Sequence, residues 1–308
     1  MRLIDVIYAK LFRKPLILSH EEDVDGIVSA TIAYIKHPDA VVVLARPREL
    51  EHYPLKVGWM KYVKWDIVAD LPCPPKTVVY VDHHKSNIPR AKIVYHDPEA
   101  PAAAVLMAKA MGLEENPLVK KLVEIAVEAD TANIVSQEAW DLNDAVKGSD
   151  YRGKIFLVKN LAKQGLEVLK LSEVRKWIER HRETRENTIK LADRIRVELV
   201  MVVRICSKLD IHGRALSIEL EKRGAMFTCI IVPEKRGRLK LHFGSKGKYD
   251  CSVIAKKMGG GGHAVAAGAL IKESEEKRFY IELKQFLKLN KLKVFLVKSF
   301  DSIEEITV

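Results

Sequence analysis

The chain has 308 residues, of which 48% are hydrophobic, and a formal net charge of +11 at pH 7. This length allows two domains with separate cores, because single domains peak at roughly 100–150 residues. No apolar run reaches the roughly 18 residues that a membrane span requires, and residues 1–14 show neither the apolar segment nor the cleavage site of a signal peptide. We therefore expect a soluble, cytoplasmic protein with no membrane partner.

The cysteines and the net charge indicate which kinds of protein this chain can be. The four cysteines are far apart and form no C-x-x-C pair, which argues against a zinc ribbon and against a disulfide framework. The excess of positive charge favours a polyanion such as a nucleic acid, although a solvated lysine-rich surface would give the same balance. Charged residues reach 30% and glutamine is nearly absent, a composition typical of heat-adapted proteins.

The most informative stretch follows an apolar run at residues 16–19, which we predict to be a strand. It carries His20, Asp23 and Asp25 and leaves through Gly26 into an Ala-rich segment that predicts a helix over residues 27–35. Loops of this kind lie at the carboxyl ends of strands in open α/β sheets, where ligands bind. Oxygen ligands with an imidazole suit Mn²⁺ or Mg²⁺ better than structural zinc. The alternative is a polar turn in which Asp25 caps the helix.

Short apolar strands alternate with helical segments through the first half of the chain. This pattern predicts an α/β fold with a parallel sheet and helices on both faces. We expect strands at residues 40–45, 66–72, 77–81 and 93–96, and helices at 1–14, 102–111 and 116–129. Arg46 and Arg48 follow the strand at 40–45, either beside a ligand cleft or as solvated side chains.

The composition shifts to long charged side chains between residues 166 and 198. This shift predicts a long helix that links two domains and is held by ion pairs one turn apart, with a nucleic-acid-binding helix as the alternative. Beyond it, strands at 199–205, 227–232, 239–243 and 293–297 and helices at 249–258 and 273–289 predict a smaller α/β domain. We therefore divide the chain into a first domain (1–165), a linker helix (166–198) and a second domain (199–308).

Acidic and imidazole side chains stand at four strand or helix ends of the first domain. If they converge at one sheet edge, their charge is prohibitive unless cations neutralise it. Two divalent cations that share Asp70 would resolve this and would activate a water molecule against a phosphate ester. Taken alone, Asp82 and Asp130 also fit capping roles. The groups are His20 with Asp23 and Asp25, then Asp70, then Asp82-His83-His84, and finally Asp130.

On these residues the chain resembles the DHH-family phosphoesterases that carry a DHHA1 domain, a group that includes RecJ-type exonucleases and nanoRNases. The match runs in the family's order from about residue 16 to about residue 270. Its motifs are Ser19-His20, Asp23-Val24-Asp25-Gly26, Asp70, Val81-Asp82-His83-His84, Asp130 and, far downstream, Gly259–Gly262 with His263 and Ala266-Ala267-Gly268.

The resemblance implies a role for each motif and two divalent cations as cofactors, Mn²⁺ first and Mg²⁺ second. One cation would be held by His20, Asp23 and Asp70, and the other by Asp25, Asp70, His83 and Asp130. Asp82 would orient the neighbouring imidazoles, and His84 would contact the phosphate or protonate the leaving oxygen. Lys246 would replace an arginine that many relatives carry where this chain has Gly244. The nucleotide would lie against Gly259, Gly260, Gly261, Gly262 and His263.

The activity implied by the resemblance is metal-dependent removal of mononucleotides from single-stranded DNA or short RNA. A 3′,5′-bisphosphonucleotide phosphatase or a cyclic dinucleotide phosphodiesterase is the alternative within the same chemistry. An inactive nucleic-acid-binding accessory subunit is the alternative from another class. The resemblance also implies a second copy in a dimer, or a helicase or a replication or repair factor, as a partner, and an archaeal or heat-adapted source.

Overall fold

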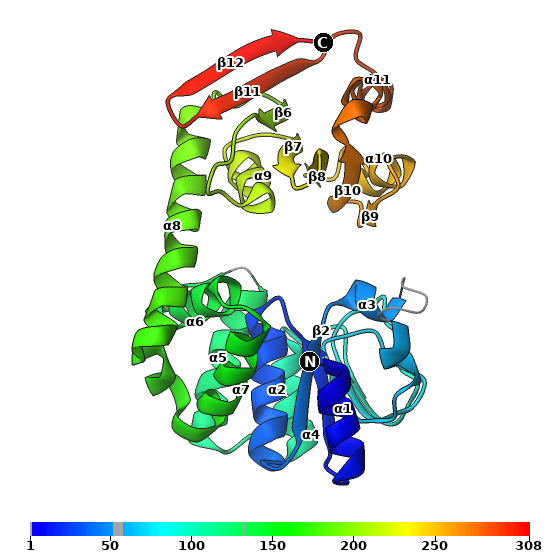
Figure 1. Cartoon of the computed structure of the whole chain (residues 1–308), viewed down its shortest axis with the longest axis vertical. Helices are drawn as coiled ribbons and strands as arrows, with labels where there is room; N and C mark the ends of the chain where they lie inside the picture. Colours follow the sequence, from blue (N-terminus) through cyan, green and yellow to red (C-terminus); the bar gives the residue numbers. More distant parts are fainter. Residues whose placement is uncertain (1, 52–57, 132) are drawn as a thin grey trace. The chain divides into compact units, whose positions relative to one another are not determined.

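A computed structural model of the chain describes residues 2–51, 58–131 and 133–308. The chain folds as two compact units, residues 1–181 and residues 182–308 (Figure 1). Among the helices that the structure describes, none combines the length and the apolar character needed to cross a membrane. Each unit has its own sheet and its own apolar core.

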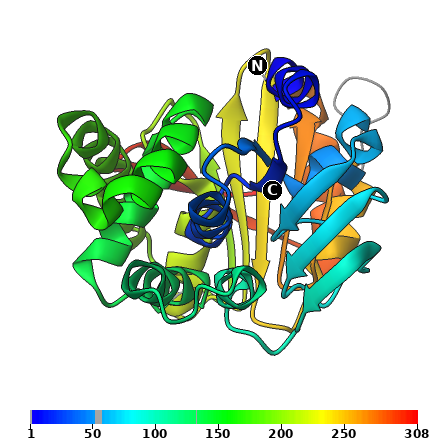
Figure 2. The same cartoon turned by 90° about the horizontal axis from the view of Figure 1, so that it is seen from below.

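The first unit is built on a parallel sheet of five strands in the order β2-β1-β3-β4-β5, as the sequence predicts. Strand β1 lies between β2 and β3, so that Leu18 is paired with Val43 on one side and with Val68 on the other. This order reverses direction between β1 and β3, the switch point at which open α/β sheets bind ligands. The strands are β1 (Leu16–His20), β2 (Val41–Ala45), β3 (Trp65–Ala69), β4 (Thr77–Asp82) and β5 (Ala91–His96). The pale-blue to cyan strands of this sheet lie side by side in Figure 2.

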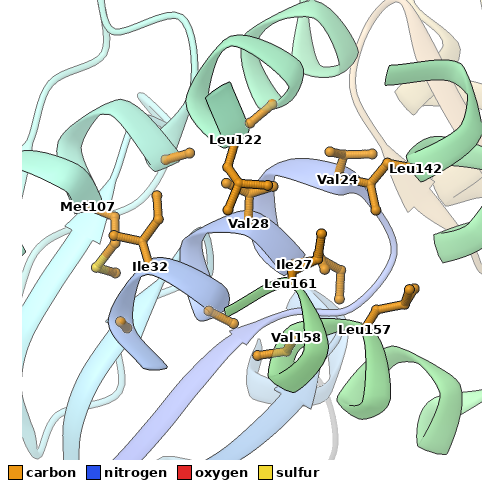
Figure 3. Packing of buried hydrophobic residues seen from close by; sticks show 14 of the residues in the cluster. Val24, Ile27, Val28, Ile32, Met107, Leu122, Leu142, Leu157, Val158 and Leu161 are labelled. Carbon is orange, nitrogen blue, oxygen red and sulfur yellow. The ribbon is translucent and has the colours of Figure 1, made fainter. Parts of the chain in front are cut away.

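Helices cover both faces of this sheet, because successive strand residues point to opposite faces. Ile17 and Ile67 enter one buried cluster, whereas Leu16, Leu18 and Val68 enter another. The first cluster is packed by α2 (Val24–Lys36), α4 (Ala103–Met111), α5 (Pro117–Asp130), α6 (Gln137–Gly148) and α7 (Tyr151–Gln164) (Figure 3). The second is packed by α1 (Arg2–Leu11), α3 (Pro47–Glu51) and the 3₁₀ turn η1 (Gly58–Tyr62).

Helix α2 begins directly after β1 and approaches it closely at Gly26. A Cβ atom at this position would lie 2.4 Å from the carbonyl oxygen of His20 and 2.6 Å from its Cβ. The Ser19 hydroxyl donates to the Gly26 carbonyl at 2.7 Å, which holds the turn. Asp23 caps α2 by accepting from the Gly26 N–H at 3.0 Å, and Asp25 lies inside the first turn. The alternative in which Asp25 caps this helix is therefore wrong.

The charged segment in the middle of the chain forms a shorter helix than the sequence predicts. Helix α7 ends at Gly165, whose φ of +60° is left-handed, and the 3₁₀ turn η2 (Gly165–Lys170) follows. The long helix is α8 (Ser172–Arg194), and the two units divide within it, between His181 and Arg182. The assignment of residues 1–165 and 199–308 to catalytic and substrate-binding domains stays a prediction.

The second unit is a smaller α/β domain, as predicted, with a mixed sheet of seven strands in the order β12-β11-β6-β7-β8-β10-β9. Part of the Gly259–Gly262 run forms the two-residue strand β9 along β10. The strands are β6 (Val200–Ile205), β7 (Phe227–Glu234), β8 (Arg238–Ser245), β9 (Gly261–Gly262), β10 (Ala266–Lys272), β11 (Lys293–Ser299) and β12 (Ser302–Thr307). The helices are α9 (Gly213–Lys222), α10 (Cys251–Lys257) and α11 (Glu276–Leu287).

The close approach at Gly26 generates a stability prediction. Gly26→Ala is expected to lower the free energy of unfolding by about 2 kcal/mol or more, because the added methyl group overlaps the His20 backbone. Gly112→Ala is the matched control: its φ is +64° but nothing lies within 4 Å of the new Cβ, so it costs only about 1 kcal/mol of left-handed strain. Urea unfolding measures both variants, and an equal loss in the two would contradict the overlap.

Candidate metal centre

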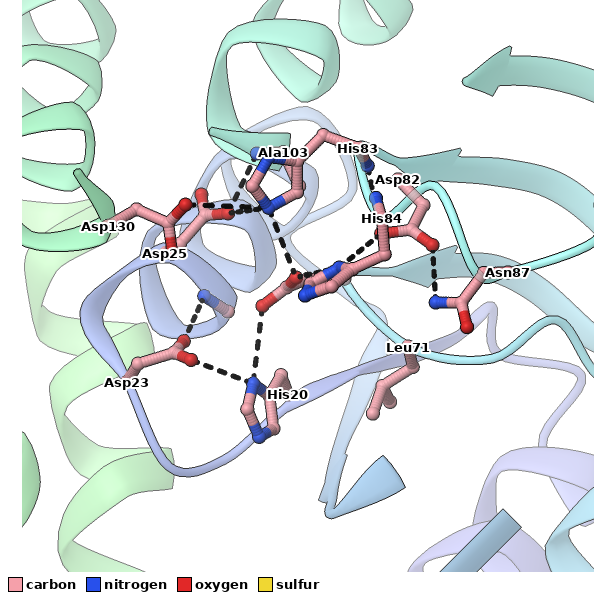
Figure 4. Close-up of polar contacts among 12 residues, drawn as sticks. His20, Asp23, Asp25, Leu71, Asp82, His83, His84, Asn87, Ala103 and Asp130 are labelled. Atoms are coloured by element: carbon pink, nitrogen blue, oxygen red, sulfur yellow. Dashed lines mark hydrogen bonds and ion pairs between the residues drawn. The ribbon is translucent and has the colours of Figure 1, made fainter. Parts of the chain in front are cut away.

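The carboxyl ends of β1, β3 and β4 bring the predicted ligands together (Figure 4). His20 ends β1, Asp70 follows β3, His83 follows β4, and Asp130 ends α5. Three sets of residues each offer ligand atoms that lie within 4.8 Å of one another. The sets are His20 with Asp23 and Asp70, Asp25 with His83 and Asp130, and Asp70 with His83 and His84.

Asp70 stands at the centre of this arrangement. One carboxylate oxygen lies 3.3 Å from Nδ1 of His20, and the other lies 3.9 Å from Nε2 of His83. The residue has a left-handed φ of 53°, a conformation that aspartate adopts more readily than most residues. Its backbone N–H donates to the Val81 carbonyl at 3.0 Å, which fixes the loop against β4. This position between the two groups is the one that a bridging carboxylate requires.

The His83 imidazole has a defined orientation. Its Nδ1 lies 3.1 Å from the Ala100 carbonyl oxygen, which can only accept, so that Nδ1 carries the proton. In the neutral imidazole, Nε2 then turns a lone pair toward the carboxylates of Asp25 at 3.7 Å and Asp130 at 3.5 Å. A lone pair that faces carboxylates is repelled by them. A cation between these atoms would turn the repulsion into coordination.

Asp25 has a second, structural role that the sequence analysis does not foresee. Its two carboxylate oxygens accept from the backbone N–H groups of Ala103 at 2.7 Å and Ala104 at 2.8 Å. These groups open helix α4, whose own N-cap residue, Ala102, offers no side-chain acceptor. Asp25 thus caps a helix that begins 78 residues further along the chain, while one of its oxygens faces His83.

The hydrogen bonds at the site test whether these residues fit a metal ion. Nε2 of His20, Oδ1 of Asp70 and Nε2 of His83 are buried and make no hydrogen bond. A buried polar atom without a partner costs free energy, and all three atoms belong to residues that can ligate a metal. Imidazole and carboxylate donors suit Mn²⁺, Mg²⁺ and related divalent cations. The donor set therefore fits divalent cations.

The pKa values of the buried carboxylates also fit a site for divalent cations. Burial, and then the charge of Asp23, raise the pKa of Asp70 to about 6. Burial, followed by the charges of Asp70, Asp23 and Asp130, also raises the pKa of Asp25 well above its usual value. The carboxylates are too close together to be ionised at once without compensation. Divalent cations would take the place of the protons that the crowded site otherwise binds.

Asp82 does not belong to any of the three ligand sets. Both of its carboxylate oxygens already accept hydrogen bonds from neighbouring residues. It is fully buried and accepts from the hydroxyl of Tyr80 at 2.5 Å, from Nδ2 of Asn87 at 2.6 Å and from the backbone N–H of His83 at 2.8 Å. Nδ1 of His84 lies 2.9 Å from Oδ1 of Asp82, and this bond raises the pKa of His84 to about 9. The sequence carries no periodic signal that marks Tyr80 or Asn87.

Arg46 lies next to the site but is held by acidic neighbours. Its Nε lies 2.6 Å from Oε1 of Glu21 and 3.2 Å from Oε1 of Glu22. The side chain of Arg48 lies outside the part of the chain that the structure describes.

The substrate-binding residues predicted in the second unit lie at its surface. Lys246, His263 and the glycines of β9 are exposed. A Cβ at Gly260 would lie 2.1 Å from the Gly268 carbonyl oxygen, so that packing against β10 already explains this glycine. A Cβ at Gly244 would lie 1.9 Å from Oε1 of Glu221, which leaves no room for the arginine of many relatives. The role of these residues in substrate binding stays a prediction.

Comparison with known proteins identifies the second unit. Residues 200–289 match the model of the DHHA1 domain. This match, the His83-containing motif and the ligand sets of the first unit agree with the resemblance to DHH-family phosphoesterases. The chain carries a DHHA1 domain, and it shares its fold with DHH-family phosphoesterases. No curated protein sequence matches this chain.

Several solved structures share its fold. One is the pGpG-specific phosphodiesterase PggH from Vibrio cholerae, with 18% identity, a TM-score of 0.68, and coverage of 90% of this chain and 99% of that one. Another is exonuclease RecJ bound to manganese, with 16% identity, a TM-score of 0.58, and coverage of 92% and 94%. RecJ from Thermus thermophilus in complex with Mn²⁺ has 15% identity, a TM-score of 0.54, and coverage of 97% and 56%. These comparisons give no support to an archaeal source.

The raised pKa of Asp70 predicts how metal binding depends on pH. Its folded-state pKa of about 6 exceeds the ordinary 3.8, so its contribution to stability is complete below pH 3.8 and is lost as the pH rises through about 6. Mn²⁺ is therefore expected to raise the melting temperature more at pH 8, where the site is ionised, than at pH 5, where protons must be displaced. Thermal unfolding in EDTA and in Mn²⁺ at both pH values measures this, and a larger shift at pH 5 would contradict it.

Proposed function

We propose that this protein is a divalent-metal-dependent phosphodiesterase that releases mononucleotides from single-stranded DNA or short RNA. The observation that carries the proposal is the convergence of the ligand sets around Oδ1 of Asp70 and Nε2 of His83, which are buried and make no hydrogen bond. One cation is assigned to His20, Asp23 and Asp70. The second is assigned to Asp25, Asp70, His83 and Asp130. Mn²⁺ is the preferred ion and Mg²⁺ the second choice, because imidazoles accompany the carboxylates.

The residues around the ligands fit phosphoryl chemistry. Cations bound here would supply a water of lowered pKa and neutralise the charge of the phosphoryl group. The hydrogen bond to Asp82 raises the pKa of His84, and the His84 side chain is 49% exposed. His84 is thus able to contact a phosphate oxygen or to protonate the leaving oxygen. Asp82, itself held by Tyr80 and Asn87, orients this imidazole.

The substrate is proposed from the charge of the chain and from its structural neighbours. The net charge of +11 suits a polynucleotide. PggH and RecJ, which share the fold, are described as a pGpG-specific phosphodiesterase and an exonuclease. Because PggH is similar over 90% of this chain, a dinucleotide such as pGpG is the second candidate substrate. An accessory role without catalysis is disfavoured, because such a role needs none of the ligand residues that converge here.

Product analysis tests the proposal. Single-stranded DNA, its RNA counterpart and pGpG, each labelled at one end, are incubated with the purified protein and Mn²⁺ or Mg²⁺. Progressive release of mononucleotides from the long strands is the expected result. Cleavage of pGpG alone would indicate a dinucleotide phosphodiesterase and would contradict the exonuclease activity. Release of inorganic phosphate would indicate a phosphatase. If the protein hydrolyses none of these substrates, the result would favour the accessory role without catalysis.

Asp70→Asn is expected to abolish this hydrolysis. The change removes one charge and one ligand oxygen from the position between the two cation sites, and loses several kcal/mol of transition-state stabilisation, a factor on the order of 10³ in rate. Asp39→Asn is the matched control, because Asp39 is exposed and belongs to none of the ligand sets. Initial rates at saturating Mn²⁺ measure both variants. Retention of wild-type rate by Asp70→Asn would exclude this site as the catalytic centre.

A further inference from the structure

A cavity of about 540 Å³ lies in the first unit beside the candidate metal centre. It is bounded by the start of α1, the ends of β1 and β2, the turn η1 and the first turn of α7. Its volume lies within the range of roughly 300–1,000 Å³ typical of small-ligand sites. The lining residues that matter here are Arg2, Glu21, Arg46, Trp59, Tyr151 and Lys154.

The two arginines of this cavity are neutralised by acidic partners. Glu21, which is 5% exposed, forms ion pairs with both Arg2 and Arg46. Arg2 also pairs with Glu49 at 2.8 Å, and Arg46 pairs with Glu22 at 3.2 Å. These contacts fix the wall of the cavity at the end of β1, directly after the predicted ligand His20.

Lys154 differs from these two arginines. Within the described part of the chain its Nζ makes no hydrogen bond and no ion pair, although the residue is only partly exposed. Burial lowers its pKa, even though Glu21, Glu22 and Asp23 act in the opposite direction. A half-buried ammonium group that makes no direct ion pair costs free energy, because carboxylates at longer range offset its desolvation only in part. An anion bound in the cavity would remove that cost.

The remaining walls are aromatic and preformed. The Tyr151 hydroxyl accepts from the Leu44 N–H at 3.4 Å, and the Arg2 guanidinium lies 4.8 Å from the centre of the Tyr151 ring. Trp59 lines the same cavity, and indole rings stack on nucleobases whatever the base. The cavity thus offers an unpaired cation for a phosphate and an aromatic wall for a base.

We propose that this cavity binds a nucleoside phosphate, with the phosphate at the Lys154 ammonium and the base against Trp59. The proposal deepens the proposed function, since Lys154 is within electrostatic reach of Asp23 and an occupied cavity would place a second phosphate next to the metal centre. The same chemistry also accepts a free nucleotide. The substrate strand and a free nucleotide are therefore the two sources that the experiment separates.

Titration of the metal-free full chain tests the site itself. Isothermal calorimetry in EDTA is performed with AMP and with adenosine, because without cations the carboxylates of the metal centre repel a phosphate. AMP is expected to bind at least about tenfold more tightly than adenosine, and Lys154→Gln to lose about that factor. Lys154→Arg is expected to keep the affinity. Lys163→Gln, an exposed lysine on the same helix, is the matched control. Equal AMP affinity in wild type and Lys154→Gln overturns the proposal.

Kinetics with Mn²⁺ then separates the sources. If the substrate strand occupies the cavity, Lys154→Gln raises KM with little change in kcat, and inhibition by AMP is competitive in the wild type. If a free nucleotide occupies it, KM is unchanged and the effect of AMP on kcat disappears in the variant. If the protein hydrolyses the strand with Mn²⁺ but does not bind AMP in EDTA, the nucleotide-binding role of the cavity is wrong and the proposed function still holds. AMP binding without hydrolysis would instead overturn the proposed function.

Discussion

Repulsion among buried carboxylates at the β1–β3 switch point governs the first unit. Asp25 and Asp70 are at most 2% exposed, and Asp23 and Asp130 approach the same imidazoles. Protons or divalent cations are the counter-charges small enough to enter such a group. The raised pKa of Asp70 is the protonated solution, and a metal centre is the other. The fold therefore crowds negative charge at this candidate site, and bound divalent cations would neutralise it.

The backbone holds this repulsive group in place through contacts that are themselves structural. Gly26 lets α2 start against His20, and Asp70 adopts a left-handed turn after β3. Asp23 caps α2, and Asp25 caps α4. Capping and metal ligation are thus not alternatives for these aspartates, because a carboxylate oxygen that accepts a backbone N–H keeps a second lone pair. The helix caps supply part of the free energy that orients the ligands.

Charge is organised differently on the two sides of the metal centre. On one side Asp82, Tyr80 and Asn87 hold His84 in a filled hydrogen-bond network. On the other side the arginines pair directly with glutamates, whereas Lys154 makes no direct ion pair with any described residue and interacts with Glu21, Glu22 and Asp23 only at longer range. The first arrangement fixes a group that acts on a phosphate. The second keeps a cation available to a phosphate, which is the physical basis of the proposed nucleotide cavity.

The sequence alone determined the parallel sheet, the smaller second α/β domain and the acidic and imidazole residues that gather at one sheet edge. Buried strands, breaks in periodicity and acidic strand ends are local signals. It did not determine α6, α7 or α9, nor the true extent of α8. In these segments apolar residues recur only weakly at helical spacing, because most positions are polar or mixed. Only the tertiary structure decided that Asp25 caps α4, that Tyr80 and Asn87 fill Asp82, and that Lys154 makes no direct ion pair with any described residue. These facts depend on contacts between residues distant in the chain or on opposite sides of a turn, and spacing along a sequence does not encode such distances.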